Sequence, residues 1–113
     1  MISKDTDASV VVVENPLICR FIRSVLTPQK VTTVDANAAE AMSLVESGDA
    51  KVCLLITNRP GAFLSVSGKL PVLYVSSQPE LGLTGAFREC RILNKPFGPS
   101  ELVGAVSALM GPR

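Results

Sequence analysis

The sequence contains no histidine and no tryptophan, and its three cysteines lie far apart. Without histidine, neither a Ser-His-Asp nor a Cys-His catalytic triad can be built, and histidine-ligated metal sites are excluded. Cys19, Cys53 and Cys90 match neither a disulfide framework nor the paired spacing of a zinc knuckle. We therefore expect reduced thiols in a cytoplasmic protein, with Cys53 packed in a strand. Nothing in the sequence lowers the pKa of Cys19 or Cys90, which favours plain packing or surface thiols over redox sensing.

Charge and long hydrophobic runs are also scarce. Charged residues make up 19% of the chain and the net charge is +1, without a basic stripe, which argues against nucleic-acid binding. No apolar run approaches the roughly 20 residues of a membrane helix, and the opening MISKDTDAS lacks the apolar stretch of a signal peptide. Hydrophobic residues form 47% of the 113 residues, enough for a core. We expect one domain over 1–113, with 1–8 as a flexible N-terminus.

Strand and helix patterns alternate along the chain. Runs such as SVVVVE (9–14) are rich in β-branched residues and are typical of strands covered on both faces. Strands are predicted over 9–14, 30–34, 51–57, 70–77 and 90–93, and helices over 15–26, 37–48 and 98–110. This alternation predicts an α/β domain with a parallel, doubly wound sheet.

Local signals mark the starts of the helices. Asn15 can cap the first helix, and Asn37 with Glu40 has the spacing of a capping box. Gly98 or Ser100 caps the last helix. Apolar residues at helical spacing predict one buried stripe on the first helix. They are Leu17, Ile18, Phe21, Ile22, Val25 and Leu26.

The third connection between strands is unusually short. Twelve residues, 59–70, separate Asn58 from Pro71, whereas a crossover between parallel strands needs about a dozen or more. These twelve include two glycines and one proline, so we expect only a turn or two of helix. The next connection, 78–89, has a similar composition, and we expect one or two helical turns near 80–88.

Polar side chains follow several of the predicted strands. In an open α/β sheet, ligands gather outside the carboxyl ends of the strands. The pattern predicts a small polar cleft that combines one carboxylate, hydroxyls, amides and one ammonium. Its residues are Glu14, Asn15, Thr57, Asn58, Ser76, Ser77 and Lys95.

The order of elements resembles the receiver domain of bacterial two-component response regulators, over nearly the whole chain. LNKPFGPSELVGAV (93–106) is similar to the end of that domain, where a Lys and Pro-Phe precede a capped last helix. LPVLYVSSQ (70–78) is similar to its fourth strand, VVVENPLICRFIRSVL (11–26) to its first strand and helix, and VTTVDANAAEAMSLV (31–45) to its second. The resemblance implies a flavodoxin-like (βα)5 fold with strand order 2-1-3-4-5 and a shortened third crossover.

The likeness fails where the family performs its chemistry. There, the third strand ends in an Asp that a histidine kinase phosphorylates, and two acids after the first strand hold Mg²⁺. Here Asn58 occupies the acceptor position, with Thr57 as the alternative counterpart, and Glu14 stands alone where paired acids are usual. An amide is a poor nucleophile toward phosphorus, and one carboxylate makes a weak Mg²⁺ site. We expect no cofactor, and Mg²⁺ binding that is weak or absent.

Three further positions correspond to residues that, in the family, respond to phosphorylation. Lys95 matches the phosphate-contacting lysine, Ser76 the switch hydroxyl, and Ile92 stands where an aromatic switch residue is usual. From the residues alone, we favour an ion pair of Lys95 with Glu14 over a relict anion contact. Ser76 is either a relict or a strand-end serine bonded to local backbone. The resemblance also implies a cis bond before Pro96.

The leading interpretation is a degenerate receiver, a non-enzymatic module of phosphorelay signal transduction that acts through protein–protein contacts. In the family, the last strand and last crossovers make dimer or output contacts, so we expect the contact face within 82–110. A second copy of the chain is one candidate partner. Arg20 and Arg23 form either a partner surface or, as we favour, a solvated helix face. The partner's identity and an output domain in a longer protein are left open.

Two other interpretations remain. One is a small-anion or nucleotide-binding module that uses Lys95, Ser76 and Ser77, although no Gly-rich phosphate loop follows the first strand. The other is a phosphorylated receiver whose acceptor is Asp35, which follows the second strand and lies at best at the edge of the cleft.

Overall fold

The computed structural model describes residues 8–47 and 51–110. Residues 1–7 of the predicted flexible N-terminus lie outside the described residues, and Ala8 already belongs to the first strand. The strands are β1 (Ala8–Val13), β2 (Thr32–Asp35), β3 (Lys51–Thr57), β4 (Val72–Ser76) and β5 (Cys90–Asn94). They form one sheet in the order β2-β1-β3-β4-β5, and every pairing is parallel, as the sequence predicts.

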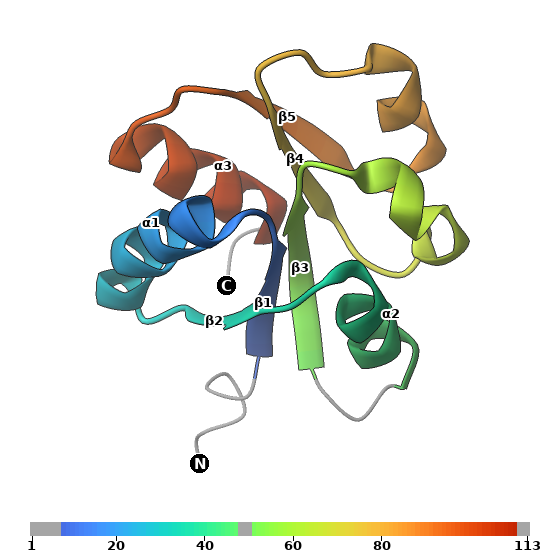
Figure 1. The fold of residues 1–113 in the computed structure, drawn as a ribbon, viewed down its shortest axis with the longest axis horizontal. Helices are drawn as coiled ribbons and strands as arrows, with labels where there is room; N and C mark the ends of the chain where they lie inside the picture. Colours follow the sequence, from blue (N-terminus) through green and yellow to red (C-terminus); the bar gives the residue numbers. More distant parts are fainter. Residues whose placement is uncertain (1–7, 48–50, 111–113) are drawn as a thin grey trace.

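Helical segments cover both faces of the sheet (Figure 1). They are α1 (Pro16–Leu26), α2 (Ala38–Ser47), α3 (Pro99–Met110) and the 3₁₀ segments η2 (Thr27–Gln29), η3 (Pro60–Val66) and η4 (Leu81–Ala86). Helices α1 and α3 pack on one face, and α2, η3 and η4 lie on the other. None of the helices within 8–47 and 51–110 is long and apolar enough to cross a bilayer.

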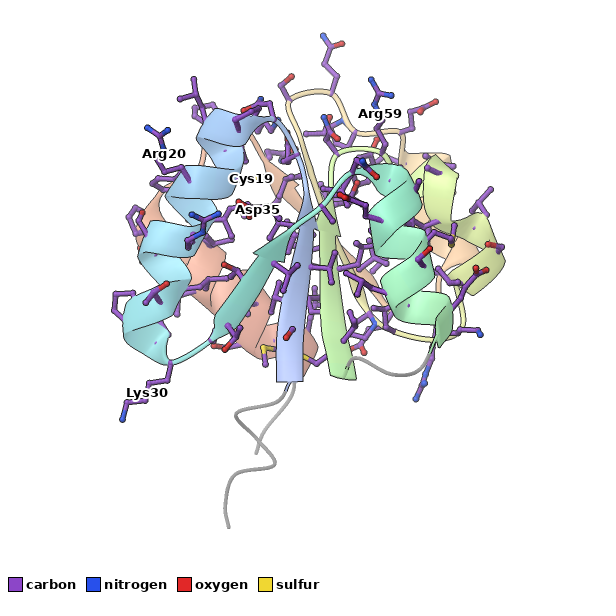
Figure 2. The ribbon with its side chains drawn as sticks, turned by 60° about the horizontal axis from the view of Figure 1, so that its bottom comes forward. Cys19, Arg20, Lys30, Asp35 and Arg59 are labelled. Atoms are coloured by element: carbon purple, nitrogen blue, oxygen red, sulfur yellow. The ribbon has the colours of Figure 1, made fainter. Side chains whose placement is uncertain are left out.

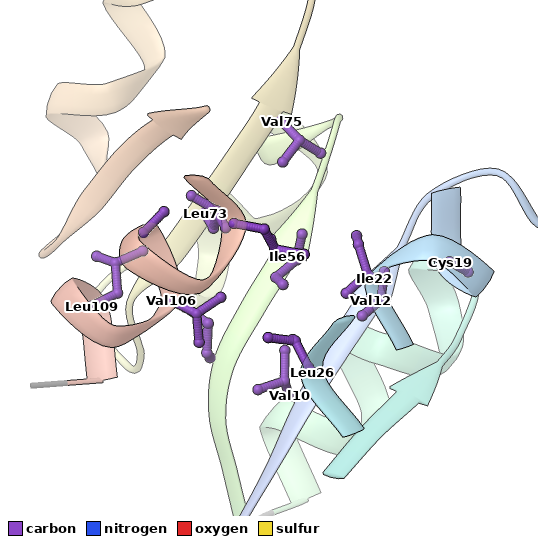
Figure 3. Packing of buried hydrophobic residues seen from close by; sticks show 13 residues of the cluster. Val10, Val12, Cys19, Ile22, Leu26, Ile56, Leu73, Val75, Val106 and Leu109 are labelled. Carbon is purple, nitrogen blue, oxygen red and sulfur yellow. The ribbon is translucent and has the colours of Figure 1, made fainter. Parts of the chain in front are cut away.

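Alternation along the strands divides the core into two clusters. Because successive side chains of a strand point to opposite faces, Val10 and Val12 face α1 and α3, while Val11 faces the other side. Figure 3 shows the first cluster, where Val106 of α3 and Ile22 of α1 approach the same strands. The buried members of this cluster are Val10, Val12, Cys19, Ile22, Leu26, Leu54, Ile56, Leu73, Val75, Leu102, Ala105, Val106 and Leu109.

The short third crossover is built from 3₁₀ turns, in agreement with the prediction. η3 begins at Pro60 and supplies Phe63 and Val66 to the second cluster, where both are fully buried or nearly so. The fourth crossover contains η4 and contributes the buried Phe87. This face is therefore covered by α2 together with tight turns of three residues each.

The predicted helix starts are largely confirmed. The Ile18 amide donates to Asn15 Oδ1 at 2.9 Å, as expected of a cap. The Glu40 amide donates to Asn37 Oδ1 at 2.8 Å, and the Asn37 amide donates to Glu40 Oε1 at 3.0 Å. These reciprocal bonds complete the capping box. Helix α3 begins directly after Gly98, which settles the choice of cap residue.

Three local predictions were wrong. Strand β4 begins at Val72 and not at Leu70. Strand β2 begins at Thr32 and not at Lys30, because Lys30 adopts a left-handed conformation (φ 64°) that ends η2. Leu17 is 72% exposed, while Cys19 is buried. At about 3.6 residues per turn, Leu17 lies roughly 200° around the helix from Cys19, so the buried line of α1 leaves it outside.

Candidate functional site

The predicted cleft forms at the carboxyl ends of the central strands. Val13 pairs with Thr57, so β1 and β3 end side by side. Ser76 pairs with Asn94, and the Lys95 amide donates to the Ser76 carbonyl at 3.0 Å, which brings the end of β5 beside that of β4. The parallel register therefore gathers the polar residues that follow these strands at one edge of the sheet.

The centre of this edge is an ion pair between Glu14 and Lys95. Lys95 Nζ lies 2.7 Å from Glu14 Oε2, and the Glu14 side chain is 0% exposed while that of Lys95 is 25% exposed. Apart from this ammonium, no hydrogen-bond donor among the described residues reaches Oε2. Glu14 Oε1 accepts a hydrogen bond from the Asn15 amide at 2.9 Å. Both carboxylate oxygens are engaged, and the ion pair favoured from the sequence is present.

The two residues that the resemblance places at the acceptor position differ in burial. Thr57 is fully buried at the end of β3, and its hydroxyl oxygen accepts a hydrogen bond from the Arg59 amide at 3.0 Å. Asn58 follows the strand and is exposed. Its side chain forms no hydrogen bond within 8–47 and 51–110, so the bond to Lys95 that its chemistry would permit is not made. Neither side chain can carry the negative charge of a phosphate acceptor.

Ser76 is engaged locally. Its hydroxyl oxygen accepts a hydrogen bond from the Gln78 amide at 3.0 Å. The structure therefore shows a strand-end serine bonded to local backbone, which was one of the two alternatives left open for Ser76. Ile92 is half-buried in β5, on the strand that forms the edge of the sheet.

Sequence reasoning missed Tyr74. It is the chain's one tyrosine, lies in β4 beside Ile92, and is 3% exposed. Its hydroxyl oxygen accepts a hydrogen bond from the Glu80 amide at 3.0 Å. The available signal was a single aromatic residue in an otherwise aliphatic strand, since a buried tyrosine usually finds a partner for its hydroxyl.

Asp35 lies away from the acceptor position. It ends β2 and forms an ion pair with Arg23 of α1. Figure 2 shows Asp35 near Cys19 at the side of α1 that faces the sheet, whereas Arg59 lies apart from them. Arg23, predicted to lie on a solvated helix face, is 54% exposed and also pairs with the edge strand.

Cys19 is buried, and Cys53 and Cys90 are half-buried. Burial raises the pKa of both Cys19 and Cys90 above the ordinary value of 9.0. The Cys19 thiol donates to the Glu14 carbonyl at 3.4 Å, and the Cys53 thiol donates to the Ser9 carbonyl at 3.3 Å. None of the three cysteines forms a disulfide. The low-pKa setting of a reactive cysteine is therefore missing at Cys19 and Cys90.

An apolar groove borders the ion pair. It has a volume of about 430 Å³ and lies between α1 and the segment that joins β5 to α3. The Phe21 and Phe97 rings meet edge to face with centroids 5.7 Å apart. The Lys95–Pro96 bond is cis, as the resemblance implies. The lining residues are Ile18, Phe21, Ser77, Lys95, Pro96 and Phe97.

The strand ends that form the cleft hold no cluster of metal-ligating side chains among the described residues. Nowhere in the described part of the chain do three or more His, Cys, Asp or Glu residues come together as they would around a metal ion. The carboxylates near the sheet's edge, Glu14 and Asp35, are each paired with a cation of the chain.

Solved structures with the same fold are receiver domains. One is a response regulator receiver protein from Sinorhizobium medicae WSM419, with a TM-score of 0.75, 20% identity, and coverage of 96% of this chain and 97% of that one. Another is the signal receiver domain of an HD domain-containing protein from Pseudomonas fluorescens Pf-5, with a TM-score of 0.73, 19% identity, and coverage of 97% and 90%. No family model and no curated protein matches the sequence. The chain therefore has the fold of receiver domains.

Proposed function

We propose that this protein is a receiver-like signalling module that has lost phosphoryl transfer, and that it acts through contacts with another protein. The observation that carries the proposal is the pair at the end of β3. Thr57 is buried with its hydroxyl already accepting a hydrogen bond, and Asn58 is an exposed, neutral amide. Formation of an acyl phosphate requires a carboxylate nucleophile, and neither residue offers one.

The ion pair supports the same proposal because it argues against Mg²⁺ binding at Glu14. Mg²⁺ binds proteins through carboxylates and retained waters. To bind at Glu14, it would have to displace the Lys95 ammonium from a carboxylate whose side chain is fully buried. Such a displacement would separate the Lys95 ammonium from its partner, while Glu14 would offer the metal a single carboxylate. We infer that the residues present do not fit Mg²⁺, and that Lys95 serves as a permanent internal counter-ion.

The proposed contact face is 82–110, which includes β5 at the edge of the sheet and α3. The partner is a protein in the cytoplasm, and a second copy of the chain is one candidate. The proposed role needs no catalysis by this domain. The alternative of an anion-binding module has less support, because Lys95 is paired and the Ser76 hydroxyl is engaged with local backbone.

The direct test is a titration with beryllofluoride, which mimics a phosphoryl group on a carboxylate, in the presence of Mg²⁺. Fluorine NMR distinguishes free from protein-bound beryllofluoride. We expect only the free species at every protein concentration, while a response regulator receiver with a complete acidic site serves as the positive control. A bound resonance from this protein would overturn the proposal.

A further inference from the structure

Tyr74 lies next to the position where the resemblance places a switch aromatic. In the parallel register, Tyr74 pairs with Ile92, and two residues earlier Val72 pairs with Cys90. Val72 and Cys90 both pack against the second core cluster. Because side chains two residues apart share a face, Tyr74 and Ile92 also point to that face, toward the side of η3 and η4. Tyr74 therefore lies one strand inward of the position of Ile92.

The setting of Tyr74 differs from that of an edge-strand residue. β4 lies between β3 and β5, whereas β5 has a neighbour on one side only. Tyr74 is 3% exposed, while Ile92 is half-buried. A buried ring on a strand with neighbours on both sides cannot swing out to solvent without opening the packed face around it.

The hydroxyl of Tyr74 ties the next connection to the strand. Glu80, whose amide donates to this hydroxyl at 3.0 Å, directly precedes η4, and its carbonyl accepts from the Leu83 amide at 3.1 Å. Ser76 lies two residues after Tyr74 in β4, and its hydroxyl oxygen accepts a hydrogen bond from the Gln78 amide. Two side chains of one buried strand thus fix the start of the β4–η4 connection.

We propose that Tyr74 is a fixed replacement for the switch aromatic, and that its hydroxyl holds the β4–η4 connection in a single conformation. This inference rests on the proposed function, since a connection that no phosphate rearranges needs no movable ring. It assigns Tyr74 a positioning role: it keeps the surface formed by the connection and η4 in the shape that a partner would meet. The hydroxyl, and not only the ring, carries this role.

Hydrogen exchange of the full chain with Tyr74→Phe tests the inference, because phenylalanine keeps the ring and removes the hydroxyl. A net hydrogen bond is worth about 1 kcal/mol, so we expect exchange of the Glu80 amide to accelerate roughly fivefold. Exchange in β1 and β3 should stay at the wild-type rate. The matched control is Ser76→Ala, which removes a hydroxyl from the same strand and should accelerate the Gln78 amide but not that of Glu80.

Three results would overturn the inference. They are an unchanged Glu80 rate in Tyr74→Phe, an equal effect of Ser76→Ala on Glu80, and acceleration spread evenly over β1, β3 and β4. The last would mean that the hydroxyl supports the whole core. The exchange experiment contains no beryllium or Mg²⁺. If beryllofluoride binds while the Glu80 effect persists, the proposed function fails and the anchoring role stands.

Discussion

At the scale of single residues, the Glu14–Lys95 pair is the feature with the sharpest consequence for stability. Replacing Lys95 with Met leaves the Glu14 carboxylate buried without a counter-ion. We expect the free energy of unfolding, measured by urea titration, to fall by about 3 kcal/mol. The double variant Glu14→Gln/Lys95→Met removes both charges and should recover most of this loss.

The exposed pair of Arg23 and Asp35 provides the matched control. The Arg23 side chain is 54% exposed, and pairs of this kind contribute about 1 kcal/mol or less. Arg23→Met should therefore change the free energy of unfolding far less than Lys95→Met does. Equal losses in the two variants would contradict the view that Glu14 depends on Lys95.

The buried thiols predict a dependence of stability on pH. Burial raises the pKa of Cys19 and Cys90 in the folded protein, so the unfolded chain releases these protons first as the pH rises. Their contribution is complete below the ordinary thiol pKa of 9.0 and is lost as the pH rises through the higher folded values. Urea titrations at pH 8 and pH 10 measure the loss. Cys19→Ala/Cys90→Ala should show a smaller drop between these pH values, and a drop of the same size would refute the assignment.

Residue-level predictions from sequence succeeded where neighbours in the chain decide the outcome. The Asn15 cap and the Asn37–Glu40 box require only a spacing of three residues. The partner of Tyr74 could not be predicted this way, because its position depends on register with β5 and on the path of the next connection.

At the scale of elements, the short segment η3 takes the place of a longer helix in the third crossover. Phe63 is fully buried in the second cluster, while Leu64, the next residue, is 46% exposed. We expect Phe63→Ala to lower the free energy of unfolding by about 3–5 kcal/mol, measured by urea titration. Leu64→Ala should cost well under half as much. Comparable losses would show that η3 does not seal this face in the described way.

Periodicity predicted the strands and helices well, but it could not define every boundary. The apolar run of KVCLLIT identified β3 as a buried strand with its observed limits, 51–57. The start of β2 was missed because the left-handed turn at Lys30 depends on backbone geometry that a lysine side chain does not signal. The apolar stripe of α1 included Leu17 because apolar character alone does not tell which residues of a helix face the sheet.

At the scale of the whole molecule, the order of elements predicted a parallel sheet, and the resemblance to receiver domains was needed to predict its strand order. Alternating strands and helices favour parallel pairing, and the likeness of LNKPFGPSELVGAV to the end of a receiver domain supplied the strand order that the structure confirms. The sequence also favoured the Glu14–Lys95 ion pair that the structure shows. It left the role of the Ser76 hydroxyl open, because the partner of that hydroxyl depends on the path of the chain after β4.

Because Lys95 and the Ser76 hydroxyl already have partners within the protein, we predict that small anions and nucleotides bind poorly. A ligand that binds only the folded state raises the melting temperature by mass action. We expect no shift with ATP, GTP or inorganic phosphate at concentrations up to the millimolar range in a thermal unfolding assay. A saturable rise that Lys95→Met abolishes would instead favour the anion-binding alternative.

The central claim is that no side chain of this domain accepts a phosphoryl group. The most direct measurement is the intact mass of the protein after incubation with acetyl phosphate and Mg²⁺. We predict a mass identical to that of the untreated protein, while a response regulator receiver treated in parallel gains one phosphoryl group. A gain of that mass by this protein, whether the group maps to Asp35 or to another residue, would contradict the account.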